Sequence, residues 1–372
     1  MSAPAEKTLQ STKSEISNRV HREAIHCRIA VIGVGDVGNN TINCLVGTGG
    51  LHAECIAINT DRLHLNAIRA AQKILIGEKT CRGLGSSGDP RVGRAAIEES
   101  RKLIEDTLSN VDVVFIAAGL GGGTGTGAAP TVAEIARHSG AVVIGVVTMP
   151  LEVEEAGMER AAQGLAEMRR QCDTVAVIDH RRLRNLVPQA LLKEEETFKV
   201  ADQMLANTIS EIVETISGPS LIDLDFSNFE AIVRRGGVAA VGVGESNAPN
   251  RVEEAVRNAF KSPMLDVDCT RASGALVHVT GDDKMTVEEA NRVGEIVAEM
   301  MRNNALVSWS AKVNPSLPGI LKVTLVMTGI QSPYLLGGFS MIAPDLYEMD
   351  HQTEPEKPLQ INLDLYQLED FE

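Results

Sequence analysis

Residues 119–127 read GLGGGTGTG and follow directly on the apolar run VDVVFIAA (111–118). Six of these nine residues are glycine and two are threonine. An ordinary strand-to-helix connection needs only about two to six residues. A glycine-rich turn lets several backbone amides approach a di- or triphosphate, and threonine hydroxyls add further hydrogen bonds. The stretch therefore predicts a phosphate-binding loop between a buried strand and a helix that begins near Ala128.

A second glycine motif lies in IGVGDVGNNT, where Gly33, Gly35 and Gly38 form GxGxxG after the first apolar run. The motif predicts a turn into a helix that begins near Asn39, with phosphate at the helix N-terminus. Taken alone it favours a Rossmann dinucleotide site, and Asp61, after the second expected strand, matches the acid that binds the ribose. A dinucleotide site does not need GLGGGTGTG, so an NAD-dependent oxidoreductase is the weaker alternative. Neither loop contains the lysine of a P-loop, which argues against kinase and Ras-like proteins.

Short β-branched runs alternate with helical stretches from residue 27 onward, which predicts a parallel sheet with crossover helices. The expected strands are RIAVIGV, ECIAINT, KILIG, VDVVFIAAG, AVVIGVVTM and TVAVID. A long helix is expected from about Thr197 to Ile216. Strands and helices then follow without strict alternation (GGVAAVGVGES, RVEEAVRNAF, GALVHVTGD, TVEEANRVGEIVAEMMRNN, LKVTLVMTG), which predicts a smaller α+β domain. The expected division is 1–26 tail or helix, 27–196 nucleotide domain, 197–220 central helix, 221–330 second domain, and 331–372 acidic tail.

Composition limits the possible partners. The chain has 372 residues, enough for two domains, with a formal net charge of −15 and only 3 % aromatic residues. Such a charge repels a phosphate backbone, so no nucleic-acid partner is expected. The six cysteines are scattered singly, which predicts reduced thiols and no metal bound by protein side chains. No apolar run is long enough for direct membrane insertion, and a cytoplasmic protein is expected.

At GGGTGTG (121–127) the sequence resembles the tubulin/FtsZ superfamily, and FtsZ of the archaeal type in particular, over roughly residues 27–330. The other resembling stretches are IGVGDVGNN, AINTD, CRGLGSSGDP, VVTMP, FKVADQML, LDFSNFEAI, GVGES and ALVHVTGD. The resemblance implies a Rossmann-like GTPase domain, a long central helix and a smaller α+β domain. It also implies a GTPase that binds GTP and GDP, polymerises with itself into filaments and acts at the cell-division site.

Carried over position by position, the resemblance implies a nucleotide site formed by both glycine motifs and several later residues. The implied nucleotide-binding residues are Gly33, Gly35, Asp36, Gly38, Asn39, Asn59, Asp61, Gly85, Gly119, Gly121, Gly122, Gly123, Thr124, Gly125, Thr126, Gly127, Pro150, Glu154, Arg160, His180, Phe198 and Asp202. Asp202 matches the family aspartate at the guanine edge. A carboxylate there can accept both N1–H and N2–H₂ of guanine, a pairing that adenine cannot supply. Asp36, Arg160 and His180 depart from the usual residues of the family.

The implied hydrolytic residues are Asp223, Asp225 and Asn228, in a loop that the family presents to the next subunit's nucleotide. The last position usually carries an acid, whereas Asn228 has an amide that cannot act as a base. The sequence leaves three explanations open. Asp223 compensates for Asn228, the enzyme is slow, or the substitution is engineered to trap a nucleotide-bound filament. Ser227 and Glu230 also fit a capping box at the start of a helix.

Few basic residues accompany the glycine loops, so Mg²⁺ is expected to neutralise the phosphates, with ligands mainly from phosphate and water. The tail LQINLDLYQLEDFE (359–372) alternates apolar residues with acids and resembles FtsZ tail peptides that dock on membrane-anchoring adaptors. A purely solubilising tail is the alternative. A slow or non-hydrolysing structural or regulatory paralogue is the alternative for the whole chain.

Overall fold

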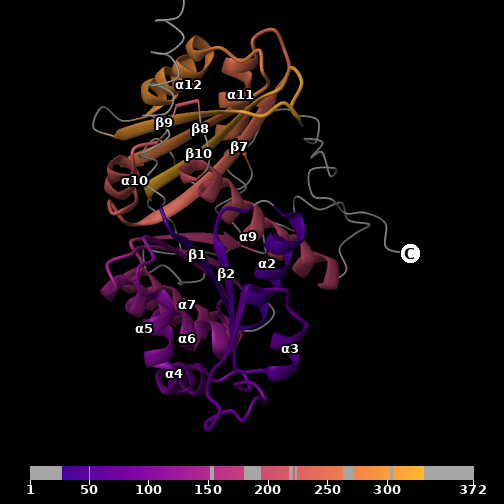
Figure 1. Cartoon of the computed structure of the whole chain (residues 1–372), viewed down its shortest axis with the longest axis vertical. Helices are drawn as coiled ribbons and strands as arrows, with labels where there is room; N and C mark the ends of the chain where they lie inside the picture. Colours follow the sequence, from indigo (N-terminus) through magenta and orange to yellow (C-terminus); the bar gives the residue numbers. More distant parts are fainter. Residues whose placement is uncertain are drawn as a thin grey trace, which may run out of the picture.

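The structure is a computed structural model that describes residues 27–49, 51–150, 155–179, 194–217, 221–222, 224–262, 272–301 and 305–330. Figure 1 shows two layered parts stacked along the long axis, with helix α9 (Glu194–Ile216) where they meet. The predicted tails at 1–26 and 331–372 lie outside the described residues. Within the described residues, no helix is long and apolar enough to cross a membrane.

The first part is a parallel sheet in the order β3-β2-β1-β4-β5-β6. Its strands are β1 (Ile29–Val34), β2 (Glu54–Asn59), β3 (Gln72–Leu75), β4 (Val113–Gly119), β5 (Val142–Met149) and β6 (Thr174–Asp179). All six predicted strands are confirmed, with ends within two residues of those expected. β1 and β5 are buried along their whole length, which explains why their sequences are continuously apolar rather than alternating.

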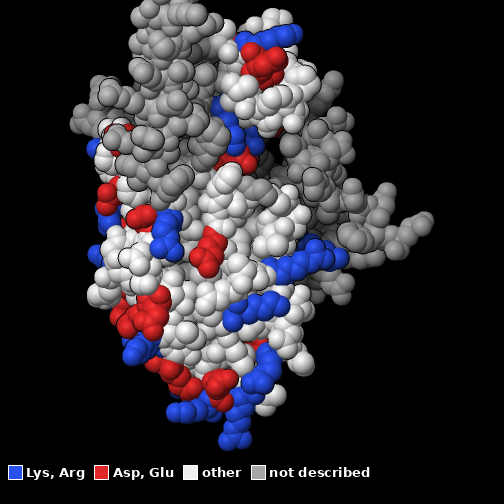
Figure 2. Space-filling view, viewed as in Figure 1, with Lys and Arg blue, Asp and Glu red and all other residues white. Residues whose placement is uncertain are grey.

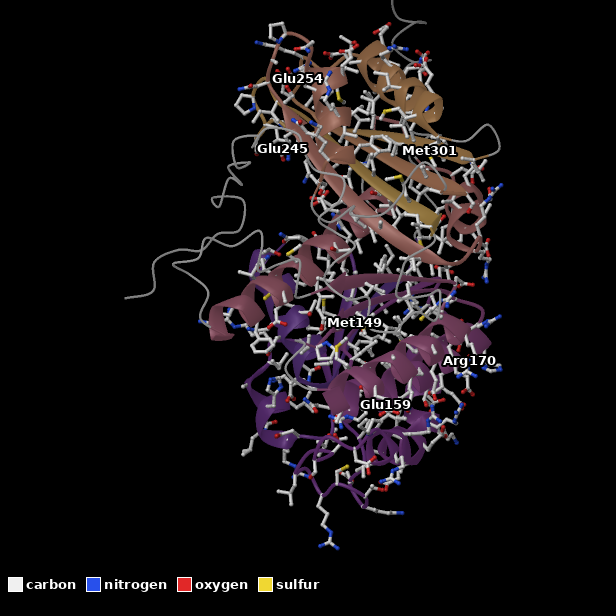
Figure 3. All side chains as sticks on the ribbon, turned by 180° about the vertical axis from the view of Figure 1, so that it is seen from behind. Met149, Glu159, Arg170, Glu245, Glu254 and Met301 are labelled. Atoms are coloured by element: carbon white, nitrogen blue, oxygen red, sulfur yellow. The ribbon has the colours of Figure 1, made fainter. Side chains whose placement is uncertain are left out.

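Helices cover both faces of this sheet. One face packs on α4 (Pro90–Glu99), α5 (Arg101–Leu108), α6 (Thr124–His138) and α7 (Glu155–Gln171). The other face packs on α2 (Gly35–Thr48), α3 (Arg62–Ala67), α9 and α10 (Phe226–Val233). Seen from behind, Glu159 and Arg170 lie on α7, across the back of the parallel sheet (Figure 3). Acidic and basic side chains are interspersed over the lower half of the face shown in Figure 2.

The second part contains β7 (Val238–Ser246), β8 (Gly274–Gly281), β9 (Leu306–Val313) and β10 (Leu321–Ile330), with α11 (Arg251–Phe260) and α12 (Val287–Met300) on its outer face. β10 pairs antiparallel with β7 and β8, and β8 pairs parallel with β9. The mixed α+β pattern is as predicted, but β9 was not predicted. Its sequence, LVSWSAKV, is only half-buried over its first four residues, so it lacks the apolar run that identifies the inner strands.

The β6–β7 pairing and helix α9 are two of the contacts that join the parts. β6 and β7 pair through only two residue pairs, Val175 with Val238 and Ala176 with Ala239, which makes one ten-stranded sheet. α9 begins three residues earlier than expected and packs against β5 on one side and β8 on the other. The carboxylate of Glu211 on α9 accepts hydrogen bonds from Lys322 Nζ and from Thr324 Oγ1, the latter at 2.7 Å. α9 is therefore held by both sheets.

Candidate functional site

The two glycine motifs place two helix N-termini side by side at the carboxyl ends of β1 and β4. α2 begins at Gly35 rather than near Asn39, and α6 begins at Thr124 rather than near Ala128, so both predicted starts were four residues late. Gly35 has φ +73°, which turns the chain from β1 straight into the helix. A Cβ on Gly35 would lie 3.0 Å from the amide nitrogen of Gly125. Unpaired amides and the positive ends of two helix dipoles therefore meet at one place, which suits a phosphate.

Several of the predicted phosphate-binding glycines are required for packing. A Cβ on Gly38 would lie 2.2 Å from the carbonyl oxygen of Ala117, and one on Gly127 would lie 2.0 Å from that of Pro90. The same close approach, under 3.0 Å, is found at Gly33, Gly119, Gly123 and Gly125. Gly122 is exposed with open space around it. The glycines thus bring helices and strands close enough to form the site, and only some of them also face its open side.

Asn39 is the residue whose side chain most clearly indicates a ligand site. Its side chain is 0 % exposed, and among the residues that the structure describes neither its Oδ1 nor its Nδ2 has a hydrogen-bond partner. Buried amides normally satisfy both groups, since an unpaired buried polar atom costs about 1–3 kcal/mol. Asn39 lies in the first turns of α2, next to the converging helix N-termini. A bound group with both acceptor and donor atoms would satisfy it.

Asp36, Asn59 and His64 form a polar group beside the start of α2. Asn59 Nδ2 donates to Asp36 Oδ1 at 2.9 Å, and His64 Nδ1 lies 3.6 Å from the same oxygen. The carboxylate of Asp36 stays largely exposed. Asp61 Oδ1 accepts from the amides of Leu63 and His64 and so caps α3. Asp36 therefore presents a negative charge at an otherwise anion-attracting helix end.

Three buried hydroxyls connect the loops of the site, and two of them were not predicted. Thr60 Oγ1 lies 2.7 Å from Thr124 Oγ1, which lies 2.9 Å from Ser86 Oγ. Thr60 follows β2, and Ser86 lies in the loop that precedes α4. Gly85, in the same loop, donates its amide to the carbonyl oxygen of Thr60 at 3.1 Å. The stretches AINTD and GLGSSGDP contain both residues, but nothing in their spacing indicates that the hydroxyls meet.

Asp202 lies on α9, where it faces α2. Its side chain is buried, and Asn40 Nδ2 donates to Asp202 Oδ2 at 3.1 Å. Burial raises the pKa of Asp202 to about 7, and the hydrogen bond from Asn40 opposes this rise. Phe198, one turn earlier on α9, is 43 % exposed. The site therefore has a buried carboxyl group beside a partly exposed aromatic ring.

Arg160 braces the glycine loop from α7. Its Nε donates to the carbonyl oxygen of Gly121 at 2.9 Å, while the Gly121 amide donates to Thr126 Oγ1 at 2.9 Å. A Cβ on Gly121 would lie 3.1 Å from Pro150. The Gly121 amide is thus already used within the protein. The predicted site residues Glu154, His180 and Asp223 lie outside the described residues.

The predicted hydrolytic loop leads into α10, and its cap differs from the expected one. Asp225 is the N-cap, with Oδ1 accepting from the Ser227 amide at 2.8 Å and from Ser227 Oγ at 2.6 Å. The predicted Ser227–Glu230 capping box is wrong, because Glu230 pairs with Arg234 instead. Hydrogen bonds from Ser227 lower the pKa of Asp225, which keeps the exposed carboxylate charged. Asn228 is exposed in the first turn of α10.

Comparison with known proteins matches both parts of the chain. Residues 28–188 match the model of the Tubulin/FtsZ family GTPase domain, and residues 237–331 match that of the FtsZ family C-terminal domain. Cell division protein FtsZ 2 of Methanocaldococcus jannaschii is 45 % identical over 88 % of this chain and 86 % of its own length. Cell division protein FtsZ 1 of Thermococcus kodakarensis is 40 % identical over 98 % of this chain and 95 % of its own. A solved structure described as an empty FtsZ dimer from M. jannaschii has a TM-score of 0.78 at 40 % identity, covering 88 % of this chain and 93 % of that one.

Proposed function

Because this chain belongs to the tubulin/FtsZ family, we propose that it binds GTP, hydrolyses it to GDP and phosphate, and assembles head to tail into filaments for cell division. The observation that carries the proposal is Asn39, a fully buried amide with no hydrogen-bond partner in the described part of the chain, beside two converging helix N-termini. A triphosphate nucleotide has the charge and the acceptor oxygens that such a site attracts. The oxidoreductase alternative receives no support from the matched families and relatives.

Guanine is the base that Asp202 would favour. A carboxylate on α9 can accept two N–H groups from guanine, while the same edge of adenine offers a different pattern. Phe198 supplies an apolar ring one turn away, on which a base can lie. The other nucleotide-binding residues that the family resemblance implies, including Glu154 at the ribose and His180 at the base, are proposed as further contacts.

Assembly would complete the active site. The relative of known structure is described as a dimer, and the loop that contains Asp223, Asp225 and Asn228 would face the nucleotide of the next subunit. A contact between two different faces repeats without closing, which builds an open filament. Asp225 would orient the attacking water, and Asn228 makes turnover slow. A slow or non-hydrolysing paralogue remains the second candidate, and Asn228 is the observation in its favour.

Mg²⁺ is proposed as the companion of the nucleotide. Among the described residues, no group of three or more His, Cys, Asp or Glu side chains could hold a metal ion by itself. Mg²⁺ keeps several water ligands and binds substrate phosphates, so it needs no cluster of protein ligands at this site. When bound, the ion would neutralise phosphate charge.

Asp36 should weaken nucleotide binding through its negative charge. Replacing it with asparagine keeps an acceptor for Asn59 Nδ2 and removes the charge. Repulsion between separated charges at a surface site amounts to roughly 0.5–1.5 kcal/mol, so Asp36→Asn should tighten GTP binding about 2- to 10-fold. Titration calorimetry at fixed Mg²⁺ would measure this. Asp106→Asn, on the exposed side of α5, is the control for a general change in net charge. Weaker binding by Asp36→Asn would mean that the carboxylate assists the nucleotide instead.

The proposed setting is the cytoplasm at the division site, with the tail at 359–372 docked on a membrane-anchoring adaptor. The amphipathic pattern of the tail supports this proposal. A chain lacking residues 359–372 should still assemble with GTP but should lose binding to such an adaptor. Loss of assembly in the truncated chain would contradict this division of roles.

The proposed function is tested by phosphate release, light scattering and negative-stain microscopy with GTP and with ATP. We expect filaments and phosphate release with GTP only. Filaments without phosphate release would favour the non-hydrolysing paralogue. A chain that neither binds GTP nor assembles would refute the proposal.

A further inference from the structure

We propose that Arg234, at the C-terminal end of α10, is a positioning residue for GTP hydrolysis. Its ion pair with Asp173, which belongs to the parallel sheet, fixes the direction in which α10 presents Asp225 and Asn228 to the next subunit's nucleotide. This inference rests on the proposed turnover of GTP in filaments. Arg234 lies outside the nucleotide site and acts only through the helix that carries the hydrolytic residues.

The end of α10 is tied to the second sheet by two hydrogen bonds. Thr328 Oγ1 on β10 donates to the carbonyl oxygen of Ile232 at 2.9 Å, and Arg235 Nη1 donates to that of Ser273 at 2.8 Å. The helix also contacts β5 on one side and β8 and β9 on the other. α10 therefore lies between the two sheets, and its direction depends on how it is held to both of them.

The parallel sheet holds α10 through a carboxylate whose own position is fixed. Asp173, which directly precedes β6, donates its amide to the carbonyl oxygen of Val143 at 2.8 Å, and its Oδ2 accepts from the Val143 amide at 2.8 Å. The side chain is only 10 % exposed. Asp173 Oδ1 accepts from Arg234 Nη1 at 3.1 Å. Arg234 thus binds a carboxylate that cannot turn without breaking its contacts to β5.

Glu230, one turn earlier on α10, holds the other side of the guanidinium. Arg234 Nε donates to Glu230 Oε1 at 2.8 Å. The donors of a guanidinium lie in one rigid plane, so two carboxylates on different nitrogens fix that plane. Arg234 itself stays 39 % exposed, and ion pairs this exposed contribute little to the stability of the fold. Loss of the pair should therefore change the direction of α10 without unfolding the chain.

A small tilt of α10 is enough to affect the reaction. Asn228 lies six positions before Arg234. At ~1.5 Å per residue this separation is about 9 Å, so a tilt of about 6° at the C-terminal end moves Asn228 by ~1 Å. A misplacement of ~1 Å costs about 100-fold in rate when it affects groups that position the reactants. The Arg234–Asp173 pair acts at the end of the helix where a slight shift has this effect.

Arg234→Gln should lower GTP turnover per assembled subunit by about 3- to 30-fold, because α10 would sample several directions. GTP affinity and the melting temperature should stay at their native values. Arg234→Lys keeps the charge and should recover part of the rate. Arg257→Gln, at an exposed position of α11, removes the same charge and should leave turnover unchanged. Phosphate release from the full chain, divided by the amount of pelleted filament, measures turnover separately from assembly.

A double-mutant cycle tests whether the two residues act as one contact. Asp173→Asn retains an oxygen for the Val143 amide and removes the charge that Arg234 binds. Each single variant should lower turnover by a similar factor, and the double variant Asp173→Asn/Arg234→Gln by no more than either alone.

Two results would overturn the inference: native turnover in Arg234→Gln filaments, or losses that multiply in the double variant. A fall in turnover matched by an equal fall in GTP affinity would also overturn it, since Arg234 would then support the nucleotide site. If native filaments released no phosphate, the proposed hydrolysis would fail first, and the role of Arg234 with it.

Discussion

Asp202→Ala should abolish the preference for guanine and weaken GTP binding by about 100- to 1,000-fold, while weak ATP binding stays as it was. The variant removes two charge-assisted hydrogen bonds at the base, each of which contributes roughly 1.5–3 kcal/mol. Sites that read a substrate by hydrogen bonds discriminate strongly, because the wrong partner leaves buried polar groups unpaired. Displacement of a fluorescent guanine nucleotide by GTP and by ATP measures both effects.

Asn40→Ala is the matched control for Asp202→Ala. It removes the hydrogen bond to Asp202 Oδ2 and leaves the carboxyl in place. We expect a loss of GTP affinity below about tenfold in this variant, with selectivity for guanine retained. Equal loss of GTP and ATP binding in Asp202→Ala would argue that Asp202 supports the fold of α9 and does not read the base.

The same carboxyl predicts a pH dependence. Burial raises the pKa of Asp202 to about 7, above its unfolded value near 3.8. The folded state therefore holds a proton that the unfolded state has released, and stability falls as pH rises from about 4 through 7. Guanine needs the charged form, so GTP affinity should instead fall about tenfold between pH 8 and pH 6, with release of a proton on binding at pH 6. Asp202→Asn should remove both dependences, and a flat profile in the native chain would contradict the assignment.

Asn228→Asp should raise GTP turnover per subunit by roughly 10- to 100-fold in assembled filaments. An amide cannot accept a proton from water, whereas a carboxylate can, and a positioned general base contributes about 100-fold or more. Asp225 is a poor substitute, because the hydrogen bonds from Ser227 lower its pKa and occupy its Oδ1 oxygen. Phosphate release measured together with light scattering separates turnover from assembly.

Ala231→Asp is the matched control for Asn228→Asp, since it adds the same charge one turn later on an exposed position of α10. It should leave turnover within about twofold of the native rate. If both acidic variants were equally fast, charge on α10 rather than a base at residue 228 would be the cause. If Asn228→Asp formed filaments without faster turnover, Asn228 would not be the slow element.

The parallel sheet could be predicted because inner strands such as β1 and β5 are buried on both faces and are therefore continuously apolar. Both helix starts in the glycine motifs were placed too late, because glycine and aspartate in a first helical turn look like loop residues. β9 was missed because it is only half-buried and carries no clear period. A sequence pattern predicts a strand only where burial imposes that pattern. β9 is held mainly by its pairing with β8, so its own sequence does not identify it.

The site was predictable only where residue types recur in motifs. The buried amide of Asn39 and the buried carboxyl of Asp202 lie at positions that the glycine motifs and FKVAD had already singled out. The hydroxyl contact between Thr60 and Ser86 through Thr124 depends on three segments that meet only in the folded chain. The choice of Asp225 over Ser227 as helix cap likewise depends on where the backbone enters the helix. Asp225 is extended, and α10 begins at the next residue.

β6 and β7 pair through only two residue pairs. We therefore expect bound nucleotide to protect the parallel sheet from local unfolding more than it protects the second sheet. Opening this pairing would break few backbone hydrogen bonds, so each sheet can retain its own resistance to local unfolding. In hydrogen–deuterium exchange, amides of β1 and β4 should become slower when GTP is bound. Amides of β8 and β9 should exchange at the same rate with and without GTP. Amides of β10 near Lys322 and Thr324 should become slower, because Glu211 on α9 binds both side chains.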